Sequence, residues 1–142
     1  MKSKLLILIF VFINNILYSQ NIPDWLKMGM TKSEIENYLN GQYLSHKNDD
    51  LYISVNTQNF IIYQYNIDKI NGLNQYWVIG LYFDIKKILD NFSMFYGDPI
   101  INNNQYWWYN SHTDLPVDVL AICITASGDA VNITYFFSNF FQ

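Results

Sequence analysis

The stretch FIIYQYNIDKINGLNQYWVIGLYF (residues 60–83) decides the fold class, because its side chains alternate with the two-residue period of a β-strand. Within residues 60–68, one face carries Ile61, Tyr63, Tyr65 and Ile67. Within residues 76–83, one face carries Trp77, Ile79, Leu81 and Phe83. Asn71 and Gly72 between the two segments favour a tight reversal. The stretch predicts antiparallel strands, since the connection is too short for a crossover.

Both strands are apolar on much of their second face as well. Two interpretations fit this composition. Either a helix covers the second face, or an aromatic surface is exposed there.

Helical patterns occur on both sides of this stretch. Residues 31–40 begin with TKSE, in which Thr31 and Glu34 form a capping box, and they end at Asn40-Gly41. A second helix is expected from Asp84, a suitable N-cap, to Gly97. Its apolar residues recur at helical spacing: Ile85, Ile88, Leu89, Phe92, Phe95 and Tyr96.

Four further segments have strand character: residues 51–55, 105–109, 117–125 and 131–137. The predicted order is helix, three strands, helix, three strands. We therefore expect an α+β fold built from tandem helix-plus-three-strand units. They would form one antiparallel sheet with two helices packed on one face.

The first 20 residues have the pattern of a signal peptide, with Lys2 and Lys4 before the unbroken apolar run of residues 5–13. That run is shorter than the roughly 20 residues of a membrane span. No cysteine lies near the expected cleavage site after Ser19, so no lipid anchor is expected. We predict a signal peptide at residues 1–20, a single α+β domain at residues 21–142, and a periplasmic or extracellular location without a stable membrane anchor.

The charge composition excludes one class of partner. The chain has a formal net charge of −4 and contains no arginine. Nucleic-acid binding requires a basic surface and is not expected. The single cysteine, Cys123, lies in an apolar run and is expected to be a small buried residue without a disulfide partner.

No catalytic constellation stands out. The only histidines are His46 and His112, and His112 lies in the sequence SHTD between Ser111 and Asp114. Members of a hydrolytic triad converge from separate parts of a fold, so a small hydrolase is the least favoured hypothesis. We expect no catalytic residues, no metal site, no cofactor and no enzymatic activity.

The strongest functional signal is aromatic. The segment QYWWY (residues 105–109) places two aromatic side chains on each face of one strand. The candidate binding residues are Trp77, Tyr82, Tyr106, Trp107, Trp108 and Tyr109. Trp and Tyr are common anchors of protein interfaces, so the first hypothesis is a binding domain for another protein. A glycan-binding module is the alternative, and the sequence leaves open which face of residues 105–109 is exposed.

Two parts of the chain resemble known families. The first is MGMTKSEIENYLNG (residues 28–41). The second runs from Ile88 through the YGDP turn (residues 96–99) and WWY (residues 107–109) to ASGDAV (residues 126–131) and ITY (residues 133–135). Together they are similar to the outer-membrane assembly lipoprotein family and to the β-lactamase-inhibitor-like fold. The resemblance implies tandem helix-plus-sheet units with an aromatic surface. It also implies protein binding of the inhibitor or envelope-accessory type through the sheet.

Overall fold

The computed structural model describes residues 22–48, 51–56 and 60–140. The predicted signal peptide at residues 1–20 lies outside the described residues. The elements in chain order are α2 (Lys32–Leu39), β1 (Tyr43–Asn48), β2 (Leu51–Asn56), β3 (Ile61–Asp68), β4 (Gly72–Leu81), α3 (Ile85–Tyr96), β5 (Ile100–Asn102), β6 (Gln105–Tyr109), β7 (Val119–Ser127) and β8 (Ala130–Phe137). None of the helices in this described part is long and apolar enough to span a membrane.

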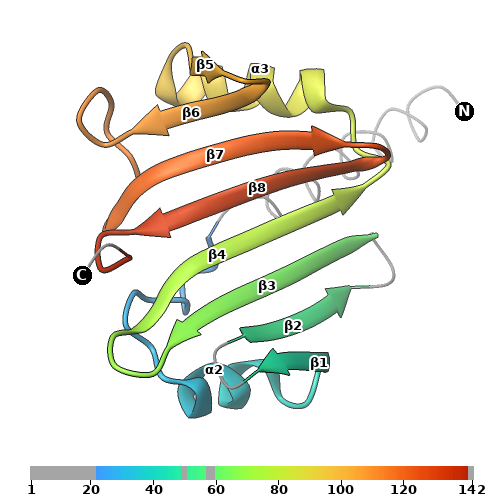
Figure 1. The fold of residues 1–142 in the computed structure, drawn as a ribbon, viewed down its shortest axis with the longest axis vertical. Helices are drawn as coiled ribbons and strands as arrows, with labels where there is room; N and C mark the ends of the chain where they lie inside the picture. Colours follow the sequence, from blue (N-terminus) through green and yellow to red (C-terminus); the bar gives the residue numbers. More distant parts are fainter. Residues whose placement is uncertain (1–21, 49–50, 57–59, 141–142) are drawn as a thin grey trace, which may run out of the picture.

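The strands form one sheet in the order β1-β2-β3-β4-β8-β7-β6-β5, and every neighbouring pair is antiparallel (Figure 1). The α+β class and the antiparallel sheet are confirmed. In the described part of the chain, α2 and α3 are each followed by four strands, one more than the sequence predicted. The additional strands are β1, whose sequence YLSHKN has no apolar alternation, and β5, which has only three residues.

The β3–β4 hairpin forms where the sequence predicted it. Asp68 pairs with Gly72, and the Asp68 Oδ1 atom accepts hydrogen bonds of 2.8 Å from the backbone N–H groups of Ile70 and Asn71. Gly72 has a φ of 71°, and a Cβ atom there would clash with the backbone of Gly29. Glycine is required at this position for both reasons.

The end of β4 differs from the prediction. The strand ends at Leu81, and Tyr82 takes a left-handed φ of 61°. The chain turns there, so the ring of Phe83 lies over Gly80 instead of sharing a face with Trp77 and Leu81.

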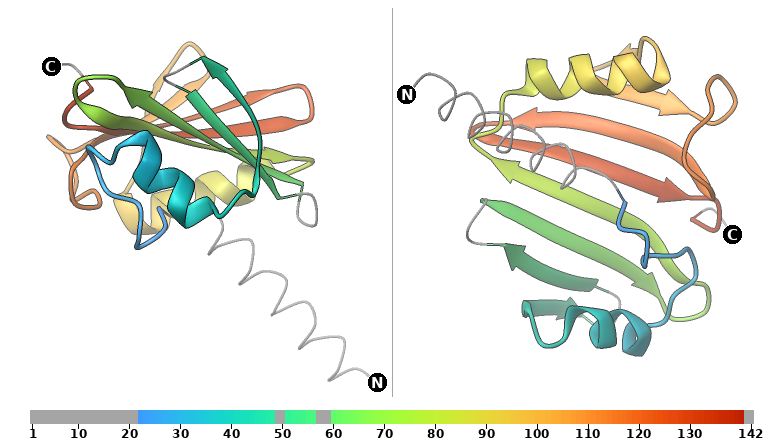
Figure 2. Two further views of the ribbon diagram at one scale, coloured as in Figure 1. Left: turned by 90° about the horizontal axis from the view of Figure 1, so that it is seen from below. Right: turned by 180° about the vertical axis from the view of Figure 1, so that it is seen from behind.

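The helix signals are correct in both places. Thr31 and Glu34 form the capping box at the start of α2, and Asp84 accepts a 3.0 Å hydrogen bond from the Lys86 N–H at the start of α3. Figure 2 shows α2 and α3 on the same side of the sheet. Their buried residues, Ile35 and Leu39 in α2 and Ile88 and Phe92 in α3, belong to the hydrophobic core.

Candidate functional site

The strand pairing assigns each side chain to one of two faces, because directly paired residues point to the same side of a sheet. We call the face toward the helices the covered face. Across the strands from β3 to β6 it carries Tyr65, Tyr76, Tyr135, Ile122 and Trp108, all buried. The opposite side, which neither helix covers in Figure 2, is the open face.

The open face is formed by alternate residues of five strands. From β3 to β6 these are Ile62, Gln64, Asn66, Gln75, Trp77, Ile79, Leu81, Asn132, Thr134, Phe136, Ala121, Cys123, Thr125, Gln105, Trp107 and Tyr109. All of them are uncharged. At the end of β3, the carboxylate of Asp68 accepts hydrogen bonds from the backbone N–H groups of Ile70 and Asn71 in its own turn. These hydrogen bonds lower the pKa of Asp68.

The structure divides the predicted binding residues of β6 between the two faces. Trp108 is 2% exposed, its Nε1–H group donates a 2.8 Å hydrogen bond to the Gly97 carbonyl, and its ring lies 5.5 Å from the Phe92 ring of α3. Tyr106 lies on the same covered face as Trp108 and packs against the core. Trp107 and Tyr109 lie on the open face and are partly buried.

Three rings of the open face, those of Trp107, Tyr109 and Phe136, form what we call the aromatic cluster. The centroids of Trp107 and Tyr109 are 5.6 Å apart with an interplanar angle of 2°, and those of Trp107 and Phe136 are 5.7 Å apart at 26°. Parallel rings at this separation are offset-stacked. Phe140 extends the cluster by an edge contact with Phe136 at 5.2 Å.

The aromatic cluster covers small residues of β7. Trp107 is on β6 and Phe136 on β8, and these strands are separated by about 9.6 Å because β7 lies between them. Their rings meet at 5.7 Å, so they lean toward each other above Ala121 and Cys123, each 5% exposed. Burial raises the pKa of the Cys123 thiol to about 11. The expectation of a small buried cysteine is confirmed.

Amide and indole groups continue the open face beside the aromatic cluster. The Asn66 Nδ2–H group donates a 3.1 Å hydrogen bond to Gln75 Oε1 across β3 and β4. Trp77, the third predicted binding residue on this face, lies on β4 and pairs with Thr134. Its buried indole N–H has no acceptor among the described residues. The open face therefore combines rings with hydrogen-bonding groups.

Tyr82 lies apart from the other candidates. It follows β4, is 74% exposed, and makes an edge contact at 6.1 Å with Phe60, which is 58% exposed. Both residues have left-handed backbone conformations, with φ values of 61° and 53°. Tyr82 is held in place by a 2.7 Å hydrogen bond from its N–H group to the Asp129 carbonyl. The predicted binding residues thus lie in three separate regions: the covered face, the open face and the turn after β4.

The loop after β6 holds the residues considered for hydrolysis. His112 is exposed and its ring makes an edge contact with Tyr109 at 6.4 Å. Ser111 and Asp114 are exposed too, and no hydrogen bond joins the three side chains in this described loop. No group of three or more His, Cys, Asp or Glu residues within the described ranges could hold a metal ion.

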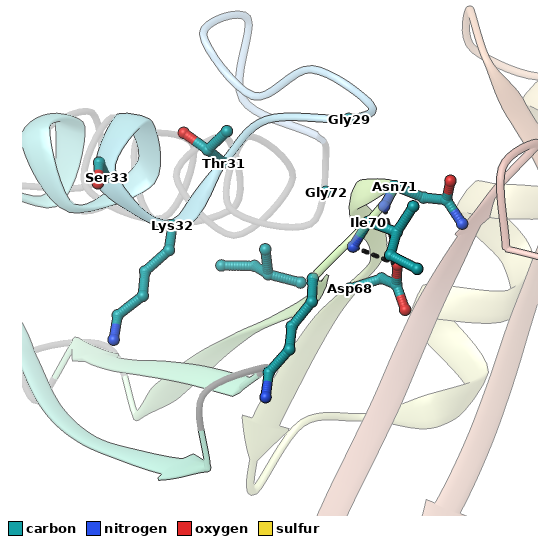
Figure 3. Close-up of a pocket in the computed structure, with 10 residues that line it drawn as sticks. Gly29, Thr31, Lys32, Ser33, Asp68, Ile70, Asn71 and Gly72 are labelled. Carbon is teal, nitrogen blue, oxygen red and sulfur yellow. Dashed lines mark hydrogen bonds between the residues drawn. The ribbon is translucent and has the colours of Figure 1, made fainter.

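Two pockets are lined by described residues outside the aromatic cluster. One of about 340 Å³ is lined by the segment before α2 and by the β3–β4 turn, including Thr31, Lys32 and Asp68 (Figure 3). The Asp68 carboxylate in this pocket accepts hydrogen bonds from the backbone N–H groups of its own turn (Figure 3). A second pocket of about 660 Å³ lies between the segment before α2 and Tyr38. Neither pocket is lined by the aromatic cluster or Trp77.

Phe136 was not among the binding residues predicted from the sequence. The signal was present in β8, where Val131, Ile133, Tyr135 and Phe137 alternate with polar residues. The side of the strand that carries Asn132 and Thr134 also carries one aromatic residue. Phe136 is that residue, and it contacts Trp107.

Comparisons of the chain with protein-family models, with curated proteins and with solved structures give no match.

Proposed function

We propose that this protein is an exported, non-enzymatic binding domain that recognises another protein through the open face of its sheet. The observation that supports the proposal is the aromatic cluster on a sheet face that neither helix covers. Interface centres are enriched in aromatic residues and depleted of charged ones. The open face has this composition, with Trp107, Tyr109 and Phe136 beside Trp77.

Other features of the chain support related parts of the proposal. The pattern of residues 1–20 supports export to the periplasm or beyond the cell. The order of one helix and four strands, followed by one helix and four strands, supports an origin from two equivalent units. An inhibitor or an envelope accessory protein would both use a sheet face in this way.

A glycan-binding module is the second candidate, because the amides of Asn66 and Gln75 lie on the same face as the rings. A sugar ring stacks on an open aromatic face. The rings of Trp107, Tyr109 and Phe136 stack on one another, and a group of aromatic side chains of this kind is typical of the centre of a protein interface, which favours a protein partner.

The proposal is tested by affinity capture from the envelope extract of the source organism, with residues 21–142 immobilised. The test variant is Trp107→Ala/Tyr109→Ala. The matched control is Tyr38→Ala/Phe95→Ala, which removes two exposed aromatic rings (59% and 73% exposed) from α2 and α3. Circular dichroism establishes that both variants are folded.

We expect one protein that the parent and the control retain and the test variant loses. Purified and titrated by calorimetry, that protein should bind the test variant at least about 30-fold more weakly, as for the loss of an interface anchor. Equal retention by both variants would contradict the proposal. Retention of polysaccharide alone would replace it with the glycan-binding function.

A further inference from the structure

Charged residues are distributed unevenly around the open face. Residues 97–142 supply β5 to β8 and therefore the whole aromatic cluster. This part of the sequence contains no lysine, arginine or glutamate. Its charged residues are Asp98, Asp114, Asp118 and Asp129, all exposed and all in connections between elements. The cluster therefore lies on an uncharged face, and the connections within residues 97–142 carry only negative charge.

The positive charges nearest in sequence lie away from this face. Lys86 and Lys87 belong to the first turn of α3, on the helix side of the sheet (Figure 2). Lys86 also forms a 3.1 Å ion pair with Asp90 of the same helix. The chain contains no arginine, so none of its own guanidinium groups can stack on the rings of the open face. The exposed charges that residues 97–142 place around the cluster are therefore all negative, while Lys69 in the β3–β4 turn lies next to Asp68.

We propose that the partner of the open face is a basic protein surface, which presents lysine or arginine side chains to the aromatic cluster. This inference rests on the proposed function and adds the chemistry of the partner. The electron-rich faces of the rings in the aromatic cluster attract a guanidinium or ammonium group, and arginine also stacks on such faces through its planar head. The four aspartates accelerate the approach of such a surface and repel an acidic one.

The experiment measures binding of defined peptides to the purified, ¹⁵N-labelled protein by NMR. The probe is a capped octapeptide of alternating arginine and serine. Its controls replace arginine by citrulline, the neutral isostere, or by glutamate, and a neutral oligosaccharide is the fourth ligand. The indole N–H signals of Trp77 and Trp107 report on the open face. Those of Trp25 and Trp108 lie on the helix side and serve as internal controls.

We expect the arginine peptide to shift the Trp107 signal, to leave Trp25 unchanged and to bind at least about tenfold more tightly than the citrulline peptide. Raising the salt concentration from about 0.02 M to about 0.5 M should weaken this binding, because the charges are exposed. Equal binding of the arginine and citrulline peptides, or tighter binding of the glutamate peptide, would overturn the inference. Because a Trp107 shift would still occur, the proposed function would stand in those cases.

Two matched double variants test whether binding depends on where the negative charges lie or only on how many there are. Asp114→Asn/Asp118→Asn should weaken binding of the arginine peptide about fivefold. Asp118 has a φ of 65°, which asparagine tolerates equally well. Asp24→Asn/Asp90→Asn removes the same charge from the N-terminal segment and α3, and should leave the affinity within about twofold. Equal losses in both variants would overturn the inference.

The remaining outcomes are also decisive. A Trp107 shift with the oligosaccharide alone would overturn both the inference and the protein-binding function. No Trp107 shift with any ligand would overturn the inference, while the capture experiment above decides the proposed function independently.

Discussion

Trp107 and Trp108 are neighbours in the sequence, yet they lie in different environments. Trp108 is enclosed between the sheet and α3, with its ring against Phe92 and its indole N–H bonded to the Gly97 carbonyl. Trp107 lies on the other side of the same strand, where its ring contacts are Tyr109 and Phe136. The difference shows that aromatic content alone does not identify a binding surface. What matters is which face a helix covers.

The difference in burial between the covered face and the open face is also seen on β8. On β8, Ile133 and Tyr135 are 1% and 2% exposed on the covered face, while Thr134 and Phe136 on the open face are only partly buried. The covered face supplies stability through buried apolar area. The open face buries less apolar area, so its residues contribute less to stability.

The largest expected effect distinguishes the two tryptophans by stability. Trp108→Ala should lower the free energy of unfolding by about 3–5 kcal/mol, because it removes a buried ring and the partner of the Gly97 carbonyl. Trp107→Ala, on the same strand, should lower it by about 1 kcal/mol. Urea denaturation followed by circular dichroism measures both. If Trp108→Ala leaves no folded protein, Trp108→Phe should still cost more than Trp107→Phe. Equal losses would show that the open face is as tightly packed as the covered one.

The next effect concerns pH and the tyrosines of the covered face. Burial raises the pKa values of Tyr65, Tyr76 and Tyr135 above the ordinary value of 10.0, with neighbouring tyrosines adding to the effect. In the unfolded chain these tyrosines lose their protons near pH 10, whereas in the folded chain they keep them. Stability should thus be insensitive to these groups below pH 10 and should fall above it, by about 1.4 kcal/mol per buried tyrosine per pH unit.

Tyr76→Phe provides the control for this pH effect. The Tyr76 hydroxyl is buried without a partner among the described residues, so the substitution should cost little at pH 7. It should make the loss of stability between about pH 10 and about pH 11 less steep, as seen in urea midpoints measured at each pH. An unchanged slope would contradict the assignment of Tyr76 as one of the linked groups.

A smaller expected effect tests whether the aromatic cluster shields the Cys123 thiol from solvent. With its pKa raised to about 11, the Cys123 thiol should react slowly with a thiol reagent at pH 8 and faster as the pH increases. Trp107→Ala should uncover the thiol, lower its pKa and speed labelling at pH 8 by about tenfold or more. Phe95→Ala removes an exposed ring from α3 and should leave the rate unchanged. A rate unaffected by Trp107→Ala would mean that other groups cover Cys123.

The smallest expected effect compares two adjacent residues of β8. Ile133→Val on the covered face should cost about 1 kcal/mol, because it leaves a cavity in a packed core. Thr134→Val on the open face should change stability by less than about 0.5 kcal/mol. Thermal and urea unfolding of both variants measure the difference. A larger cost at Thr134 would indicate that its hydroxyl has a structural role.

Local signals predicted most of the elements. The capping box of Thr31 and Glu34, the N-cap Asp84 and the Asn71-Gly72 reversal act within a few residues, so the sequence alone reveals them. The edge strands β1 and β5 were missed, because they obtain regular structure from pairing with β2 and β6 rather than from their own pattern. The Asn103-Asn104 turn, with φ values of 49° and 62°, was an available signal for the β5–β6 hairpin.

Less of the candidate site could be predicted. The sequence identified Trp77, Trp107 and Tyr109 as candidates, but it grouped them with Tyr106 and Trp108, which lie on the covered face. Strand alternation assigns residues to two faces without saying which face meets a helix. Phe136 lies 27 residues after Tyr109 in the sequence, so its contact with Trp107 depends on the order of strands in the sheet.

By itself, the sequence determined the α+β class, the caps and the central hairpin, since each depends on backbone preferences and periodicity over short distances. It also determined that the charges of residues 97–142 are all negative. Only the tertiary structure decided which half of residues 105–109 would be buried. It placed α3 against Trp108, and so left Trp107 to pack with Phe136 on the open face. The physical reason is that burial depends on contacts between elements, which no single strand encodes.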